Sequence, residues 1–285
     1  MISRITVALA ILVLGGSFNV ARAQFAGVTP EEVTQYRALV ATLPASQQAW
    51  EQKLESNLGN SYFPNYLRSR LKNERTAWDY VTDKPLLPRV IIVGDSVSLG
   101  YTLRVRDAMA STANIHRAPT NTGPTTTGLA KMDYWLNGEK WDVIMFNFAI
   151  HDAWASTTRY HDNLSEIVRR LKLTNPTSTL VWARTTPFVI ANLTPQLTAP
   201  MMNQVSDAIM TSNNIAMIDL YSPIVGHELD YQLADKTHYN EYGKAALAAA
   251  VVQGLNSVLV LVPEPSSLMA AAGVGALALL KRSRK

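Results

Sequence analysis

The chain has 285 residues, of which 47% are hydrophobic and 17% are charged, a composition typical of a globular protein with one large core. Residues 1–23 and 266–285 hold six of the 26 basic residues and none of the 22 acidic ones, so the rest of the chain has a net charge of −2. The formal charge of +4 therefore does not indicate a nucleic-acid partner, and none is expected. The sequence has no cysteine, so the fold is expected to be stable without disulfides.

Residues 1–23 have the pattern of a secretory signal peptide. An early arginine precedes a short apolar run, and Ala21-Arg22-Ala23 is a small-x-small cleavage site. The apolar run is too short to favour a membrane anchor. We therefore predict cleavage before Gln24 and export of the mature protein.

Residues 24–87 are expected to form a helical extension packed on the main domain. The sequence TPEE at 29–32 combines a capping Thr, a Pro at the first helical position and an acidic first turn, which predicts a helix start. A second helix is expected over 46–57, with an end at Leu58-Gly59-Asn60. Residues 62–78 have a mixed, aromatic pattern.

Residues 88–260 alternate between strand and helix patterns. Apolar, β-rich runs occupy 89–93, 113–117, 141–149, 178–186 and 215–220, and helical stretches occupy about 97–112, 126–137, 158–173, 201–213 and 240–258. This alternation predicts an α/β fold, a three-layer sandwich around a central five-stranded parallel sheet. The nearly continuous apolar run at 141–149 is typical of a central strand.

Residues 261–285 have the pattern of a sorting signal. The sequence VPEP precedes an apolar stretch over 268–280 and a terminal basic cluster. Thirteen helical residues span only about 20 Å, less than a ~30 Å hydrocarbon core, so a transient membrane contact is expected. The pattern resembles the PEP-CTERM tail of exported bacterial proteins. This resemblance implies processing by an exosortase-like enzyme and a location in the periplasm, at the cell surface or outside the cell.

Polar clusters follow predicted strands at the edge where parallel sheets bind ligands. They are Gly94-Asp95-Ser96, Ala149-Ile150-His151-Asp152 and Asp235-Lys236-Thr237-His238. Asp235 and His238 are expected on one face at a helix start, where the carboxylate orients the imidazole. His238 would then deprotonate Ser96, which lies on a strand-to-helix turn whose N–H groups bind an oxyanion.

Each cluster also has a purely structural interpretation. Gly-Asp-Ser is a common turn and helix cap, and Asp-x-x-His before a helix can be a cap beside a surface histidine. One His-Asp pair without further spaced ligands is weak evidence for a metal, so no metal and no organic cofactor are expected. The chain order Ser, Asp, His on predicted strand ends favours catalysis.

Four blocks of the sequence resemble the GDSL, or SGNH, hydrolase family. In chain order they are IIVGDSVSLGYT at 91–102, NTGPTTTGL at 121–129, AIHD at 149–152 and DKTHYNEYG at 235–243. The resemblance implies the flavodoxin-like SGNH hydrolase fold over 88–260. It also implies that Ser96, His238 and Asp235 form the catalytic triad and that the Gly123 N–H donates to the oxyanion.

The third block departs from the family pattern. It has Ala149 and His151 where the family has Gly and Asn. An imidazole N–H can donate as an amide does, so His151 is expected to be the replacement oxyanion donor. The alternatives are that Asn147 reaches the oxyanion, or that only the Ser96 and Gly123 N–H groups bind it while His151 orders a loop.

The expected function is that of an exported serine esterase that removes acetyl or other small acyl groups from carbohydrate. The carbohydrate substrate rests on the resemblance, on export and on two candidate stacking aromatics, Trp154 and Tyr239. Two alternatives stay open at this point. One is a lipid or aryl esterase, and the other is a non-catalytic surface protein that binds carbohydrate on the same fold.

Overall fold

The computed structural model describes residues 25–136, 138–190 and 195–260. The signal peptide predicted for 1–23 and the structure of the tail at 261–285 lie outside these residues. Within the described ranges, no helix combines the length and the apolar character needed to cross a membrane.

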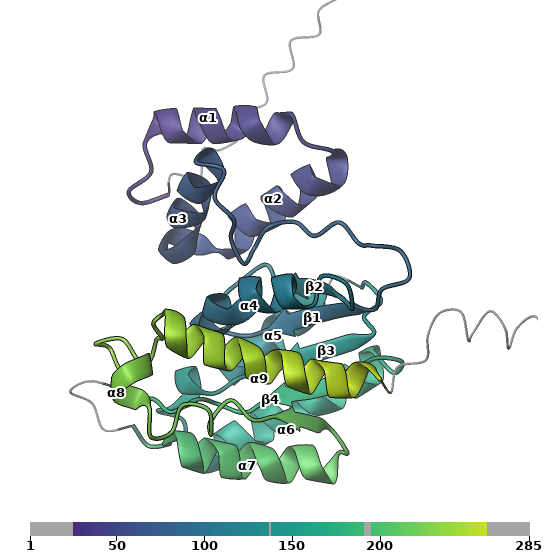
Figure 1. Ribbon diagram of the computed structural model, residues 1–285, viewed down its shortest axis with the longest axis vertical. Coiled ribbons are helices and arrows are strands. Elements are labelled where there is room, and N and C mark those ends of the chain that lie inside the picture. Colours follow the sequence, from purple (N-terminus) through teal and green to yellow (C-terminus); the bar gives the residue numbers. More distant parts are fainter. Residues whose placement is uncertain (1–24, 137, 191–194, 261–285) are drawn as a thin grey trace, which may run out of the picture.

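Five short parallel strands form one sheet in the order β2-β1-β3-β4-β5 (Figure 1). The strands are β1 (Arg89–Val93), β2 (Asn114–Arg117), β3 (Val143–Phe146), β4 (Thr179–Ala183) and β5 (Ala216–Ile218). Strand β3 lies in the middle of the sheet and is buried throughout, as a strand covered on both faces requires. The expected five-stranded parallel sheet is confirmed.

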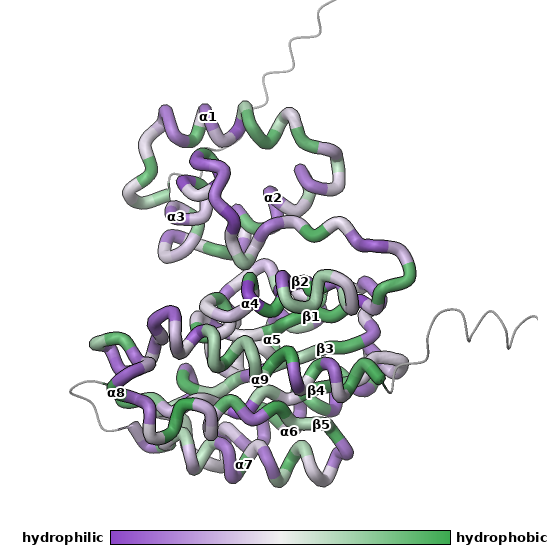
Figure 2. The backbone as a smooth tube through the Cα atoms, viewed as in Figure 1, coloured by the Kyte–Doolittle hydropathy of each residue, from purple (hydrophilic) through white to green (hydrophobic). Residues whose placement is uncertain are grey.

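Helices cover both faces of this sheet and so form the expected three layers. They are α4 (Ser96–Ala108), α5 (Thr125–Leu136), α6 (Thr157–Thr174), α7 (Ala199–Ser212), the short α8 (Glu228–Tyr231) and α9 (Glu241–Leu259). Alternate residues of β1 face opposite layers. Ile91 packs in a cluster with residues of α5, α6 and α7, whereas Ile92 packs in a second cluster with residues of α4 and α9. Apolar residues accordingly concentrate along the strands (Figure 2).

Strand β3 is shorter than the predicted run 141–149 and ends at Phe146. The run stays apolar beyond the strand because Phe148 and Ala149 are buried in the core, each 1% exposed. The chain leaves the sheet there and forms a 3₁₀ turn, η1 (Ile150–Asp152). An apolar pattern indicates burial and not strand pairing, so the strand predicted from the sequence was longer than β3.

The extension consists of α1 (Pro30–Ala41), α2 (Ala45–Asn57) and α3 (Gly59–Leu71). Helix α1 begins as predicted, with Thr29 and Glu32 in a reciprocal capping box. Helix α2 ends at Asn57 and Leu58 is its C-cap, so the expected end at Leu58-Gly59-Asn60 is confirmed. Gly59 has a φ of +58°, which turns the chain directly from α2 into α3, and α3 accommodates Pro64 in its interior.

The extension has a small core of its own and also contacts the sheet domain. Its buried cluster includes Phe63 and Leu67, and Leu99 of α4 packs against that cluster. Arg75 forms a bidentate ion pair with Asp107 on α4, at 3.1 and 2.6 Å. The residue boundaries predicted for the extension and the hydrolase domain stay predictions.

We expect Gly254→Ala in α9 to lower the free energy of unfolding by about 1–3 kcal/mol. An added Cβ would lie 2.5 Å from Cγ1 of Ile218 in β5, so helix and strand would have to separate. The matched control is Gly100→Ala in α4, where a Cβ would meet the flexible Lys244 side chain at 3.2 Å. Urea denaturation measures both variants, and equal stability of the two would contradict the close packing of α9 on β5.

Candidate active site

The turn after β1 places Ser96 at the carboxyl edge of the sheet. Helix α4 starts at Ser96, and the Asp95 carboxylate caps it by accepting the Val97 N–H at 3.0 Å. A Cβ on Gly94 would lie 2.9 Å from the Ser98 Oγ, so the tight turn needs glycine there. Ser96 is half-buried, and its N–H makes no hydrogen bond with another described residue, as is usual for the first residue of a helix.

A continuous chain of hydrogen bonds joins Ser96 to His238 and Asp235. The His238 Nε2 lies 2.7 Å from the Ser96 Oγ. The His238 Nδ1 lies 2.7 Å from Oδ2 of Asp235. The structure thus brings together three of the residues singled out in the sequence, although the serine is 142 positions from the histidine.

Asp235 and His238 lie in a turn before α9 and not at the helix start expected from the sequence. Helix α9 begins only after Asn240, whose side chain caps it. Oδ1 of Asp235 accepts the N–H groups of Thr237 at 3.0 Å and His238 at 2.9 Å, and this folds the turn. The carboxylate therefore fixes both the backbone and the ring of the histidine.

The charge of Asp235 is stabilised by these hydrogen bonds. Partial burial raises the pKa of Asp235, but the N–H groups of His238 and Thr237 and the His238 ring outweigh it and lower the pKa to about 2. The carboxylate is therefore ionised at neutral pH and can stabilise an imidazolium beside it. The side chains of His238 and Asp235 are 42% and 51% exposed, so the site is open to solvent.

Asp152 anchors the loop that contains Gly123. Its carboxylate is buried and accepts the backbone N–H of Thr125 at 2.8 Å and the Thr125 hydroxyl at 2.7 Å. Thr125 starts α5, two positions after Gly123, which has a φ of +71°. The Gly123 N–H makes no hydrogen bond with any residue that the structure describes. This role of Asp152 could not be predicted from the sequence, because Thr125 lies 27 positions away along the chain.

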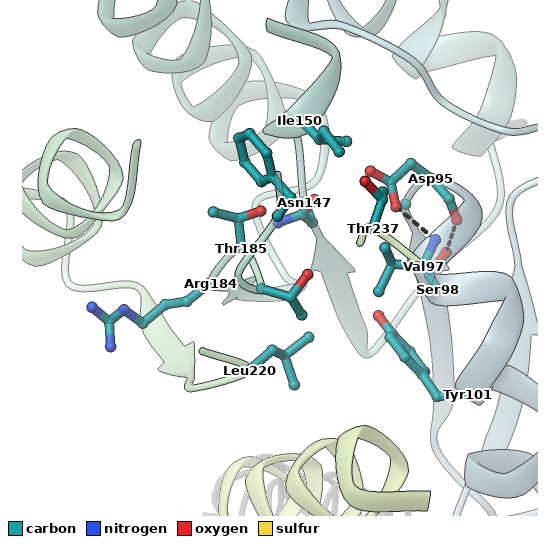
Figure 3. A pocket seen from close by; sticks show the side chains of 13 residues that line it. Asp95, Val97, Ser98, Tyr101, Asn147, Ile150, Arg184, Thr185, Leu220 and Thr237 are labelled. Carbon is teal, nitrogen blue, oxygen red and sulfur yellow. Dashed lines mark hydrogen bonds between the residues drawn. The ribbon is translucent and has the colours of Figure 1, made fainter. Parts of the chain in front are cut away.

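Neither His151 nor Asn147 forms a hydrogen bond with Ser96 in the described part of the chain. His151 lies on η1 with its imidazole exposed and without a hydrogen bond to another described residue. Asn147 donates its amide to the Ala183 carbonyl of β4 at 2.6 Å. Asn147 and Ile150 line a cavity of about 20 Å³ together with Asp95 (Figure 3). The role of His151 as oxyanion donor stays a prediction.

The two candidate stacking aromatics differ in exposure. Trp154 follows η1 and is 49% exposed. Tyr239 is only 3% exposed, and its hydroxyl donates to the Pro187 carbonyl at 3.0 Å. The expectation that Tyr239 offers a stacking surface is therefore wrong, because the turn before α9 directs it into the core. In the described part of the chain, no cluster of three His, Asp or Glu side chains is arranged to hold a metal ion.

The C-terminal tail matches a known sorting signal. Residues 261–285 match the PEP-CTERM protein-sorting motif, which confirms the predicted sorting tail and marks an exported protein. The comparison with curated protein sequences finds no match.

Solved structures of esterases share the α/β fold. A lipase/acylhydrolase from Enterococcus faecalis has a TM-score of 0.53 at 16% identity, over 62% of this chain and 98% of that chain. An acetylxylan esterase from Geobacillus stearothermophilus has a TM-score of 0.50 at 14% identity, over 59% and 93%. A psychrotrophic esterase from Pseudoalteromonas sp., inhibited by monoethylphosphonate, has a TM-score of 0.51 at 14% identity, over 60% and 98%. These likenesses show that the chain has the same α/β fold as the three enzymes, with an added N-terminal extension.

The buried carboxyl of Asp152 predicts a specific pH dependence of stability. Burial raises the pKa of Asp152 and outweighs the hydrogen bonds from Thr125 that lower it. Between the unfolded-state and the higher folded-state pKa, the native state binds more protons than the unfolded state. The contribution of Asp152 to stability is therefore greatest below the unfolded-state pKa and falls as the pH rises through this window.

We expect Asp152→Asn to remove this fall in stability with rising pH. The Tm of the wild type minus that of the variant should decrease as the pH rises from about 4, the usual carboxyl pKa, towards neutrality. The control is Asp133→Asn on the exposed face of α5, whose Tm should stay parallel to the wild type. A difference between wild type and Asp152→Asn that is constant with pH would contradict the effect of burial.

Proposed function

We propose that this protein is an exported serine esterase that uses Ser96, His238 and Asp235. The observation that supports this most is the pair of 2.7 Å hydrogen bonds from Ser96 to His238 and from His238 to Asp235. The His238 Nε2 takes the proton of Ser96 Oγ as that oxygen attacks the ester carbonyl, and Asp235 stabilises the imidazolium. His238 then gives the proton to the leaving alcohol. Water, activated by the same histidine, releases the acid from the acyl-serine.

The oxyanion is proposed to bind the N–H groups of Ser96 and Gly123. Neither group donates to another described residue, so both are available for a developing negative charge. The start of α4 adds a partial positive charge at Ser96. His151 is proposed as a third donor, because its ring makes no other hydrogen bond with the described chain and η1 adjoins the site.

We propose acetylated carbohydrate as the substrate. An acetylxylan esterase is among the proteins that share the fold, and the sorting motif marks an exported protein. The open triad and the exposed Trp154 suit an acyl group carried on a large, polar chain.

One observation favours the alternative of a lipid or aryl esterase. Val189 and Leu233 are 54% and 47% exposed. Their N–H groups donate to the carbonyls of Lys236 and His238, at 3.1 and 2.8 Å, so both apolar side chains adjoin the catalytic turn. An apolar acyl chain would find contacts there.

Substrate hydrolysis tests both parts of the proposal. We expect release of acetate from acetylated xylo-oligosaccharides, with kcat reduced at least about 10³-fold in Ser96→Ala because the nucleophile is lost. Hydrolysis of medium-chain lipid esters without turnover of acetylated sugars would overturn the carbohydrate substrate and favour the alternative. Sugar binding without turnover of any ester, in a folded protein, would favour a non-catalytic binding protein.

Substitution of His151 tests its role as a donor. We expect His151→Ala to lower kcat by about 10²-fold with little change in KM, since one oxyanion hydrogen bond forms only in the transition state. His151→Asn should retain most of kcat, because an amide N–H can donate to the oxyanion in place of the imidazole N–H. An unchanged kcat in His151→Ala would leave only the two backbone N–H groups as donors.

A further inference from the structure

Arg117, the last residue of β2, is a buried arginine that the sequence analysis did not single out. It is 2% exposed, and its guanidinium donates only to neutral oxygens of the described chain. Its Nη2 donates to the Gly94 carbonyl at 2.8 Å, the Asp95 carbonyl at 3.0 Å and the Ser98 Oγ at 2.9 Å. Its Nη1 donates to the Ala118 carbonyl at 3.2 Å and the Thr120 carbonyl at 2.5 Å. Burying a charged guanidinium among neutral partners costs desolvation free energy, so its presence here needs a specific explanation.

These partners belong to two loops that meet at the site. Gly94 and Asp95 form the turn before the nucleophile, and Thr120 lies in the loop that leads to Gly123. The Thr122 N–H donates to the Gly94 carbonyl at 3.4 Å and forms a second, longer link between the loops. Arg117 therefore joins the two segments that supply the oxyanion N–H groups in the proposed function.

The planarity of the peptide bond makes this link directional. The carbonyl of Asp95 and the N–H of Ser96 belong to one rigid, trans peptide unit and point in opposite directions. A hydrogen bond that fixes the Asp95 carbonyl therefore also fixes the direction of the Ser96 N–H. The Ser98 hydroxyl donates to the same carbonyl at 2.6 Å and reinforces it.

The extension shields this guanidinium. The ring of Trp78 lies 5.3 Å from the Arg117 Cζ, within the range of a cation–π contact, and Trp78 belongs to the buried cluster of the extension. Burial lowers the pKa of Arg117 to about 10, so the side chain stays charged at neutral pH. The extension thus contributes to the surroundings of the nucleophile turn as well as covering α4.

We propose that Arg117 is a positioning residue that holds the Ser96 and Gly123 N–H groups in the geometry that binds the oxyanion. This role rests on the proposed function. Arg117 does not touch the substrate, so its effect should appear in kcat and not in KM.

The test compares Arg117→Met with a matched arginine. Arg106 of α4 also donates to backbone carbonyls, those of Ile115 at 3.0 Å, Thr76 at 3.4 Å and Ala77 at 3.1 Å, and none of these belongs to the two loops. With p-nitrophenyl acetate as the probe, we expect kcat to fall about 100-fold in Arg117→Met, with KM little changed. Arg106→Met should lose thermal stability but retain kcat. Arg117→Lys should have an intermediate kcat, since an ammonium reaches only some of the carbonyls.

The outcomes separate this proposal from the proposed function. A wild-type kcat in folded Arg117→Met, or an equal loss in Arg106→Met, would overturn the positioning role and leave the esterase intact. If Arg117→Met does not fold, as judged by circular dichroism, the folded Arg117→Lys variant decides: a reduced kcat supports the role and an unchanged kcat overturns it. A wild-type protein that hydrolyses no ester would overturn the proposed function, and the positioning role with it.

Discussion

The hydrogen bond between the His238 Nε2 and the Ser96 Oγ is the interaction on which the site depends, and it joins segments 142 residues apart. Only the parallel sheet makes this contact possible, because it brings the carboxyl ends of its strands to one edge. The burial of β1 and β3 fixes that edge, and the turn at Gly94 and Asp95 then presents Ser96 from it. Stability and chemistry are thus linked through the same strand ends.

Around this hydrogen bond, polar side chains fix loops that the apolar core does not reach. Asp152 holds the start of α5, Arg117 holds the carbonyls of the turn before Ser96, and Asp235 holds the turn of His238. Each of these side chains forms hydrogen bonds with backbone groups, so each fixes the local backbone conformation as well as its own position. Asp152 and Arg117 are buried, so fixing the backbone in this way has a cost in desolvation.

The sequence predicted the sheet and its helices because these depend on local pattern. It also singled out Ser96, Asp235 and His238, which the structure brings together. Strand β1 matches its predicted bounds, since Gly94 and Asp95 stop an apolar run abruptly. The predictions failed where tertiary contacts decide: Phe148 is apolar because it is buried beyond β3, and Tyr239 points into the core. Arg117 and Asp152 gave no pattern at all, because their partners are backbone groups that only the folded chain brings near.

The most direct test of the account is reaction of the exported protein with a fluorophosphonate, followed by peptide mass mapping. A phosphonate bonds to a serine only when a neighbouring base activates it and an oxyanion site receives its oxygen. We expect one adduct, on Ser96, that is absent in a folded Ser96→Ala variant. A folded wild-type protein that stays unlabelled, or that is labelled at another residue, would contradict it.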